Sequence, residues 1–263
     1  MKMIKKILAA FSLYSRIPVP HSWAGDDIEG AITPLPLVGV LIAVVMFGLA
    51  YLLDLLKCPV FAGAVIVTAV PLLVTGGFHA DGFMDTADAL RSYADREKKL
   101  EILKDPHIGA FAVTGLVTAV MLMVFSTGLV MYMQLLWDIP VILFLGAVFV
   151  ISRAMAALTS VYIINAKEDG MITAEKSGIK TGDVIVLACF VIIPLALMAY
   201  YFVIYAIAQI ISFALVTVIY KRMVMKNFGG VTGDTAGYYI VMSEIVTGVM
   251  LSLAMLVFPM GGL

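Results

Sequence analysis

Long apolar stretches separated by short polar segments dominate the chain. Stretches of about 20 apolar residues predict membrane-spanning helices, because a helix of that length crosses the hydrocarbon core. The nearly uncharged run 184–219 would be about 54 Å long as one helix, against a core of about 30 Å. We therefore expect two spans there, joined by a tight turn near residues 201–205. The seven predicted spans cover residues 35–56, 58–75, 109–133, 139–163, 184–202, 203–220 and 236–258.

The positive charges support this topology. Seven spans place 15 of the 17 Lys and Arg residues on one side, the exceptions being Lys57 and Arg153. The positive-inside rule makes that side the cytoplasm. With a single span at 184–219, Lys221, Arg222 and Lys226 would fall outside. Every sizeable polar loop then faces the cytoplasm, so we expect a site in a prokaryotic cytoplasmic (inner) membrane that is fed from the cytoplasm.

Composition sets the class of protein. The 263 residues are 62% hydrophobic and 13% charged, whereas a soluble domain is nearer a quarter charged. This predicts an all-α integral membrane protein with one polytopic domain, residues 1–263. The net charge of −1 gives no indication of nucleic acid, the sequence has no basic tail, and no nucleic-acid partner is expected. Cys58 and Cys189 lack metal-ligand spacing. Apolar residues at helical spacing between Lys2, Lys5 and Lys6 predict an amphipathic interfacial helix, retained rather than cleaved.

The stretch GGFHADGFMDTADAL, residues 76–90, follows the second predicted span. At 100° per residue, Asp85 lies 40° from Asp81 and Asp88 lies 20° to the other side, so the three carboxylates share one helix face. Two carboxylates about 5 Å apart at an effective dielectric constant of 20 repel by roughly 3 kcal/mol. Residues 76–90 contain no cation to offset this. Oxygen ligands favour Mg²⁺ or Mn²⁺; the alternative is a solvated acidic face. His79 is either a hydrogen-bonded loop histidine or a group for substrate contact or proton transfer.

Two further polar segments adjoin predicted spans. In KDPHIGAF, residues 104–111, Asp105 either caps a helix that begins at Pro106 or lines the site together with His107. In NFGGVTGDTAG, residues 227–237, Thr232 or Asp234 could be a plain cap, or the loop could bind an anion, and Asp234 would supply a fourth metal oxygen. The glycines of that loop expected to approach the anion are Gly229, Gly230 and Gly233.

Two charged residues fall inside predicted spans. Arg153 and Glu244 should face the protein interior, because a buried charge at a helix centre costs about 2.5–3.5 kcal/mol or more. They either pair with one another, or Arg153 binds a phosphate while Glu244 orients a ligand. The loop 165–182 is expected to be mostly a solvated connection.

Together these motifs resemble the cobalamin synthase family, the adenosylcobinamide-GDP ribazoletransferases. The stretches that carry the resemblance, in family order along nearly the whole chain, are SRIPVP (15–20), GGFHADGFMDTADAL (76–90), KDPHIGAFA (104–112), SRAMA (152–156) and GGVTGDTAG (229–237). The resemblance implies a membrane transferase that joins α-ribazole, or its 5′-phosphate, to adenosylcobinamide-GDP and releases GMP. It also implies dependence on Mg²⁺, with Mn²⁺ as a substitute. A homo-oligomer, or association with other late enzymes of vitamin B12 biosynthesis, is compatible with it.

The resemblance also assigns roles to residues. Asp81, Asp85 and Asp88 match the acidic motif of the family, and Asp234 matches the aspartate of its Gly-rich loop; these four are the expected catalytic and metal-binding carboxylates. His79, Asp105 and Arg153 match further motif positions. His107 stands where the family commonly has Arg.

Two other functions fit parts of the pattern. A CDP-alcohol phosphotransferase also cleaves a nucleoside diphosphate ester with Asp-bound metal, but its DG-x-x-AR motif and later D-x3-D are missing here. A cation-coupled transporter would use Asp81, Asp85, Asp88 and Glu244 as an ion path near the middle of the membrane.

Overall fold

The protein is described by a computed structural model, which covers residues 2–24, 28–137, 140–167 and 170–259. In these ranges the secondary structure is helical apart from one isolated β-bridge between Asn165 and Val231. This confirms the predicted all-α class. The helices are α1 (Lys2–Tyr14), α2 (His21–Ala24), α3 (Leu35–Leu55), α4 (Val60–Thr68), α5 (Val70–Thr75), α6 (Phe78–Arg91), α7 (Arg96–Ile102), α8 (Ala110–Trp137), α9 (Ile142–Tyr162), α10 (Met171–Lys176), α11 (Thr181–Asn227) and α12 (Gly233–Val257).

Several helices have the length and composition of membrane spans. Among the described residues, α3, α8, α9, α11 and α12 are long and apolar enough to cross a membrane individually. The segment α4–α5 and helix α6 form a further pair bent by 91°. Gly76 and Gly77 make this corner with φ angles of 65° and 83°, a left-handed conformation that glycine adopts without steric cost. We assign the membrane crossing to α4–α5 and place α6 outside the membrane-spanning part.

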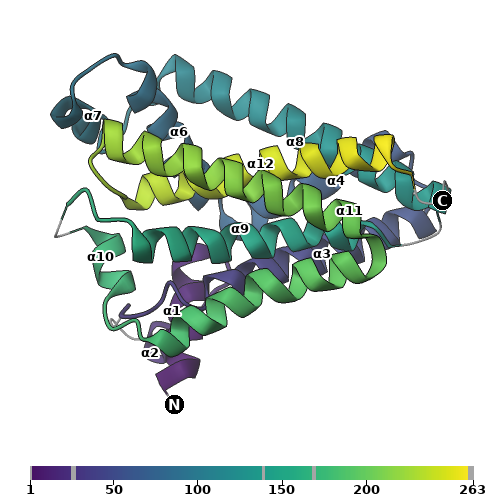
Figure 1. The fold of residues 1–263 in the computed structure, drawn as a ribbon, viewed down its shortest axis with the longest axis horizontal. Helices are drawn as coiled ribbons and strands as arrows, with labels where there is room; N and C mark the ends of the chain where they lie inside the picture. The colour runs from purple at the N-terminus through teal and green to yellow at the C-terminus, as the bar shows by residue number, and fades with distance from the viewer. Residues whose placement is uncertain (1, 25–27, 138–139, 168–169, 260–263) are drawn as a thin grey trace.

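The longest helix, α11, is two helices in space. Phe202 has non-helical dihedral angles (φ −151°, ψ 91°), and the chain reverses its direction there, as the two green halves in Figure 1 show. The reversal lies within the turn predicted at residues 201–205. Counting the halves separately supports two spans in this region, while the total of seven crossings stays a prediction.

The helices extend beyond the predicted spans at one end of the bundle. The second half of α11 continues to Asn227, and α12 begins at Gly233, so the predicted loop 220–235 shrinks to a short connection. The Thr232 side chain accepts a hydrogen bond from the Thr235 N–H (3.1 Å) and caps α12. Asp234 therefore lies in the first turn of a helix and not in a loop.

The long helices run side by side, with α9 and α12 in the interior of the bundle. Helices α7 and α10 lie at the end of the bundle opposite to the C-terminus (Figure 1). Helix α1 buries Ala9, Ala10 and Tyr14 and exposes the polar Lys5 and Ser12, as expected for an amphipathic helix, although the apolar Met3 and Ile4 are exposed as well. Its location at a membrane interface stays a prediction. Residue 139, where the fourth predicted span begins, lies outside the described residues.

Candidate active site

Helix α6 carries the three carboxylates of the acidic motif on one face. Its opposite face is apolar: Phe83 is buried and stacks on Tyr238 of α12, with ring centroids 5.3 Å apart. Asp81 is exposed, and Asp85 and Asp88 are half-buried. The amphipathic spacing of the sequence thus determines which side of α6 is polar.

A close helix contact brings Asp234 to this face. A Cβ atom on Gly82 would lie 2.8 Å from Asp234 Cα, so only glycine allows α6 and α12 to approach this closely. The pKa of Asp85 is raised to about 6, first by burial and then by the charges of Asp81, Asp234 and Asp88. Because these charges act on Asp85, the four predicted carboxylates form one electrostatic cluster with contributions from two helices.

Asp88 has a second and more specific role. Its Oδ2 accepts a hydrogen bond from the Gly109 N–H (2.7 Å) and its Oδ1 accepts one from the Ala112 N–H (2.8 Å). Both donors belong to the unpaired N–H groups at the start of α8. Asp88 therefore caps α8 from a different helix, and the alternative that Asp105 caps a helix at Pro106 is wrong, since α8 begins at Ala110.

Removal of this cap should destabilise the protein measurably. We expect Asp88→Ala to lower the free energy of unfolding by about 1–2 kcal/mol, because two N–H groups lose their acceptor. Asp105→Ala, the matched control, should cost less than half of that. Thermal unfolding in detergent measures both, and equal stabilities of the two variants would contradict the capping role.

The carboxylates are chemically suited to a hard cation, although they do not form a finished cage. Among the described residues, no three or more His, Cys, Asp or Glu side chains converge closely enough to hold a metal ion. The donors of the cluster are all oxygens, the ligands that Mg²⁺ takes. Burial and then the neighbouring carboxylates raise the pKa of Asp85, while the positive charge of Lys167 acts on Asp234. The donor set therefore fits a divalent cation, and the metal assignment stays a prediction.

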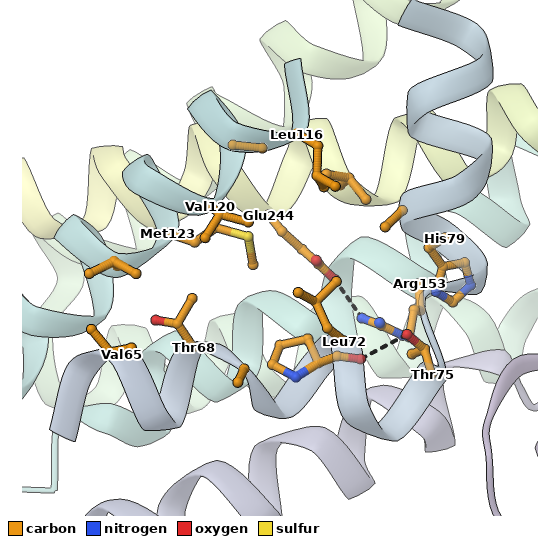
Figure 2. A pocket seen from close by; sticks show the side chains of 16 residues that line it. Val65, Thr68, Leu72, Thr75, His79, Leu116, Val120, Met123, Arg153 and Glu244 are labelled. Carbon is orange, nitrogen blue, oxygen red and sulfur yellow. Dashed lines mark hydrogen bonds and ion pairs between the residues drawn. The ribbon is translucent and has the colours of Figure 1, made fainter. Parts of the chain in front are cut away.

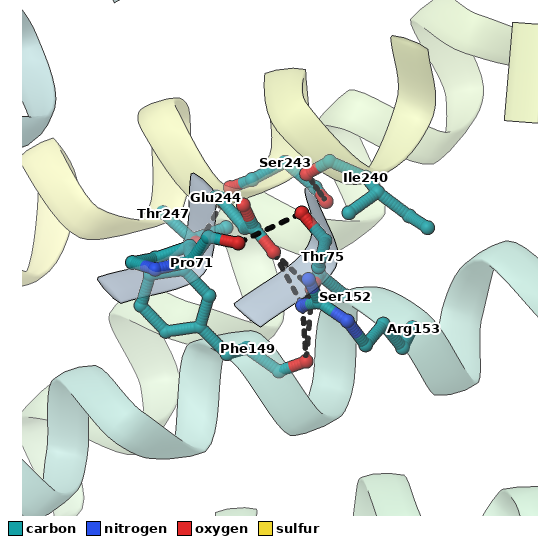
Figure 3. Close-up of polar contacts among 9 residues, drawn as sticks. All are labelled: Pro71, Thr75, Phe149, Ser152, Arg153, Ile240, Ser243, Glu244 and Thr247. Atoms are coloured by element: carbon teal, nitrogen blue, oxygen red, sulfur yellow. Dashed lines mark hydrogen bonds and ion pairs between the residues drawn. The ribbon is translucent and has the colours of Figure 1, made fainter. Parts of the chain in front are cut away.

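The two charged residues inside spans pair with one another. Arg153 Nη1 lies 2.6 Å from Glu244 Oε1, and both side chains are buried. Arg153 Nη1 also donates to the Phe149 carbonyl (2.9 Å), and Ser152 Oγ donates to Glu244 Oε1 (3.1 Å), as Figure 3 shows. The pairing alternative is thereby confirmed. The ion pair does not test whether Arg153 or Glu244 also binds a ligand.

His79 lies on the opposite side of α6 from the carboxylates. It is two positions before Asp81, which places the two side chains about 160° apart around the helix. The His79 side chain is 5% exposed and stacks on Tyr14, with ring centroids 6.1 Å apart. Neither ring nitrogen has a hydrogen-bond partner among the described residues. The structure thus groups His79 with the interior residues, and its predicted catalytic role is untested.

The segment before α8 is exposed. Asp105 Oδ1 accepts a hydrogen bond from the His107 N–H (2.9 Å) and lies 2.6 Å from its Nδ1. The side chains of Asp105 and His107 are 51% and 89% exposed. They are free to meet a ligand from solution, and Asp88 anchors Gly109 at the end of this segment.

The Gly-rich loop is packed for most of its length. Gly229, with φ 75°, lies under the Arg96 guanidinium, and Gly230 lies against the backbone of residues 164–166. Both glycines are buried, which gives a packing reason for their lack of a side chain. Gly233 is exposed and has open space beside it. Of the three glycines predicted to contact an anion, only Gly233 is therefore open to a ligand, and the anion contact stays a prediction.

The sequence did not predict the buried carboxyl group of Glu175. Glu175 of α10 is 3% exposed, although residues 165–182 were expected to be mostly solvated. It lines a small cavity with Tyr14 and His79, and burial raises its pKa. Ile172 of the same helix is also buried. The spacing of apolar residues within MITAEK was therefore the sequence signal from which the burial of one face of α10 could have been predicted.

These features define a multi-pass helical membrane protein with an acidic cluster on α6 and α12. The family model described as cobalamin-5-phosphate synthase matches residues 6–252, so the chain belongs to this family. A relative from Lachnoclostridium phytofermentans named adenosylcobinamide-GDP ribazoletransferase is 34% identical over 97% of this chain and 95% of its own. Relatives of the same name from Clostridium perfringens (strain SM101) and Clostridioides difficile are 30% and 29% identical, over 94% and 92% of this chain and 96% and 95% of theirs. No solved structure matches the chain.

Proposed function

We propose that this protein joins α-ribazole, or its 5′-phosphate, to adenosylcobinamide-GDP and releases GMP. Two findings support this: membership of the cobalamin-5-phosphate synthase family and the activity for which its relatives are named. The observation in the structure that carries the proposal is the carboxylate cluster, where Asp234 of α12 meets the acidic face of α6 at Gly82. An acidic cluster of this kind suits a reaction at a diphosphate, which needs cations at its oxygens.

The reaction is a displacement at phosphorus. A ribose hydroxyl of α-ribazole attacks the phosphate attached to cobinamide, and the bond to GMP breaks. GMP leaves with the electron pair, and the hydroxyl loses its proton. Mg²⁺, when bound, supplies positive charge to the oxygens on which negative charge develops. In the proposal, Asp81, Asp85 and Asp234 hold the ion.

The remaining residues position the site. Asp88 fixes Gly109 at the start of α8 and so holds the exposed segment of Asp105 and His107 next to α6. The open Gly233 lies beside Asp234 at the N-terminus of α12, where backbone N–H groups favour an anion. We propose that this end of α12 and the exposed segment contact the phosphates of the substrate.

Protonation of Asp85 should weaken metal binding. Its pKa of about 6 means that Asp85 is largely ionised at pH 7.5 and largely protonated at pH 5, where it loses its charge as a ligand. We expect the Mn²⁺ affinity of the free protein, measured by electron paramagnetic resonance, to fall about tenfold over this range. In Asp85→Asn the affinity should be low at both pH values. An unchanged affinity of the wild type would contradict the role of Asp85.

The proposed site faces the cytoplasm. The acidic cluster lies near α7, and Tyr93, in the short segment between α6 and α7, is 93% exposed. We expect a cysteine placed by Tyr93→Cys to react with a membrane-impermeant maleimide in inside-out vesicles and not in intact cells. The same substitution at Leu56, next to Lys57 at the other end of α3, should show the reverse pattern. Labelling of position 93 in intact cells would overturn the orientation.

A transporter is less consistent with the structure. An ion path through Glu244 would need this carboxylate to be available, but it is held by Arg153 and Ser152. The remaining carboxylates lie on α6 and at the first turn of α12. A CDP-alcohol phosphotransferase is set aside by the family match.

A genetic experiment tests the proposed function in the cell. A bacterial strain that lacks its own ribazoletransferase should form cobalamin from added cobinamide and dimethylbenzimidazole when it carries this chain. The empty vector is the control. Full membrane expression without any cobalamin would contradict the proposal.

A further inference from the structure

A cavity lies behind α6, on the side away from the carboxylates. Its volume is about 210 Å³, and α4–α5, α6, α8, α9 and α12 all contribute to its walls. Figure 2 shows that its two ends differ in chemistry. Val65, Val120 and Met123 lie at one end, and His79, Arg153 and Glu244 lie at the other.

Some polar atoms of the residues that line this cavity lack partners. Thr68 Oγ1, both ring nitrogens of His79 and Arg153 Nε are buried and have no hydrogen bond among the described residues. The side chains of Thr68, His79 and Arg153 are 4%, 5% and 1% exposed. Buried polar atoms are nearly always hydrogen-bonded, and an unpaired one costs about 1–3 kcal/mol. Of these residues, Arg153 and His79 lie at the polar end of the cavity and Thr68 lies near Val65, so a ligand at the polar end can supply an acceptor to Arg153 Nε.

The walls specify the chemistry of this ligand. The Nε–H of Arg153 can only donate, so the ligand needs an acceptor at its polar end. The Glu244–Arg153 pair is internally neutralised, so the cavity does not call for a charged ligand. The other end is apolar and requires a hydrocarbon portion. An uncharged ring with an acceptor nitrogen at one edge and methyl groups at the other meets both conditions.

The volume of the cavity limits which part of the two proposed substrates it can hold. Pockets for drug-sized ligands measure roughly 300–1,000 Å³, so a cavity of about 210 Å³ holds a bicyclic ring and neither whole substrate. The corrin ring is too large. Guanine has hydrogen-bonding groups on several edges, which the apolar walls would leave unpaired. The dimethylbenzimidazole base of α-ribazole has one free acceptor nitrogen and two methyl groups at the far edge.

The cavity also adjoins α6, the helix that carries the three carboxylates. His79 lies in the first turn of α6, and Asp81 follows it by two residues, about 3 Å along the helix axis. The cavity therefore reaches the end of α6 at which the carboxylate face begins, and the ribose of a nucleoside bound there would pass around the N-terminus of α6 to reach the carboxylates.

We infer that this cavity binds the benzimidazole base of α-ribazole, with the acceptor nitrogen toward Arg153 and His79 and the methyl groups toward Val65, Val120 and Met123. This inference rests on the proposed function and deepens it. It gives Arg153 and His79 a role in recognising the nucleoside, separate from the carboxylates that act on the diphosphate.

Filling the cavity at its apolar end tests the inference. Val120→Phe should raise the KM for α-ribazole at least tenfold, while the KM for the riboside of unsubstituted benzimidazole should rise less than threefold. The KM for adenosylcobinamide-GDP should stay the same. Val117→Phe is the matched control: it makes the same change on α8 at a position that is 54% exposed and away from the cavity, and it should leave all three constants within twofold.

The opposite change covers the case in which Val120→Phe does not fold. Val120→Ala enlarges the cavity and should use a naphthimidazole riboside at least tenfold better than the wild type does. An unchanged preference between nucleosides in both variants, with an active wild type, would overturn the inference. The same result together with co-purified lipid that is lost in Val120→Phe would assign the cavity to an acyl chain, which also overturns it. A wild type that uses neither nucleoside would instead contradict the proposed function.

Discussion

Asp85→Asn should lower the rate of GMP release from adenosylcobinamide-GDP at least about 100-fold. A group that acts on the charge of the transition state typically contributes a factor of 10²–10³, and Asp85 is the carboxylate on which the other three act. The substitution replaces one carboxylate oxygen by an amide nitrogen and keeps the shape of the side chain. The measurement is single-turnover GMP release by the purified protein with saturating α-ribazole.

The stability of this variant separates a chemical role from a structural one. Removing the charge of Asp85 relieves repulsion within the cluster, so the melting temperature in detergent should stay the same or rise. Asp54→Asn, at an exposed carboxylate at the end of α3, should leave the rate within twofold. GMP release at the wild-type rate by folded Asp85→Asn protein would remove Asp85 from the site.

Arg153→Met should destabilise the protein by about 3–5 kcal/mol, because it leaves Glu244 buried without its partner. Arg153 is 1% exposed, and its contact with Glu244 Oε1 is 2.6 Å long. Unfolding in a detergent titration should show the loss as a lower midpoint. Arg222→Met, at an exposed cation on α11, should change the stability by less than about 0.5 kcal/mol.

The double variant Arg153→Met/Glu244→Met gives the control. Replacing both partners of a buried ion pair by apolar side chains of similar volume is often close to neutral, so most of the lost stability should return. A double variant as unstable as the single one would mean that the pair does not account for the effect. Because the cavity behind α6 includes both residues, the double variant should also lose affinity for α-ribazole.

Local patterns in the sequence predicted most of the architecture. The apolar run 184–219 was too long for one span, and the chain reverses at Phe202. The spacing of Asp81, Asp85 and Asp88 placed them on one face of α6, since helical periodicity depends only on neighbours along the chain. The cost of leaving either charge alone in a membrane made the pairing of Arg153 with Glu244 one of two predicted alternatives, and the structure shows the pair.

Contacts between distant segments could not be predicted in the same way. Asp88 caps α8 at Gly109, 21 positions further along the chain, and the pattern DPHIGAF gave a stronger local signal for a cap at Asp105. Gly229 and Gly230 suggested an open anion loop, but Arg96 and residues 164–166 cover them. In each case the deciding partner comes from another helix, whose position depends on the packing of the whole bundle.

The position of His79 illustrates the same limit. It is only two residues from Asp81, which favoured a shared site, but the helix turns it toward the interior. There it meets Tyr14 of α1 and lies on the cavity of Arg153 and Glu244. The position of His79 in the sequence therefore placed it on the correct helix. It did not predict the function of the face of α6 opposite to the carboxylates.

The central claim is that this chain transfers α-ribazole to the phosphate of adenosylcobinamide-GDP at the carboxylate cluster. The most direct measurement incubates the purified protein in lipid nanodiscs with both substrates and Mg²⁺ and quantifies GMP and adenosylcobalamin over time. We expect one GMP to form for each adenosylcobalamin. Neither product should form when α-ribazole is omitted, when EDTA is added or in Asp85→Asn. GMP release without α-ribazole, or adenosylcobalamin formation in EDTA, would contradict the central claim.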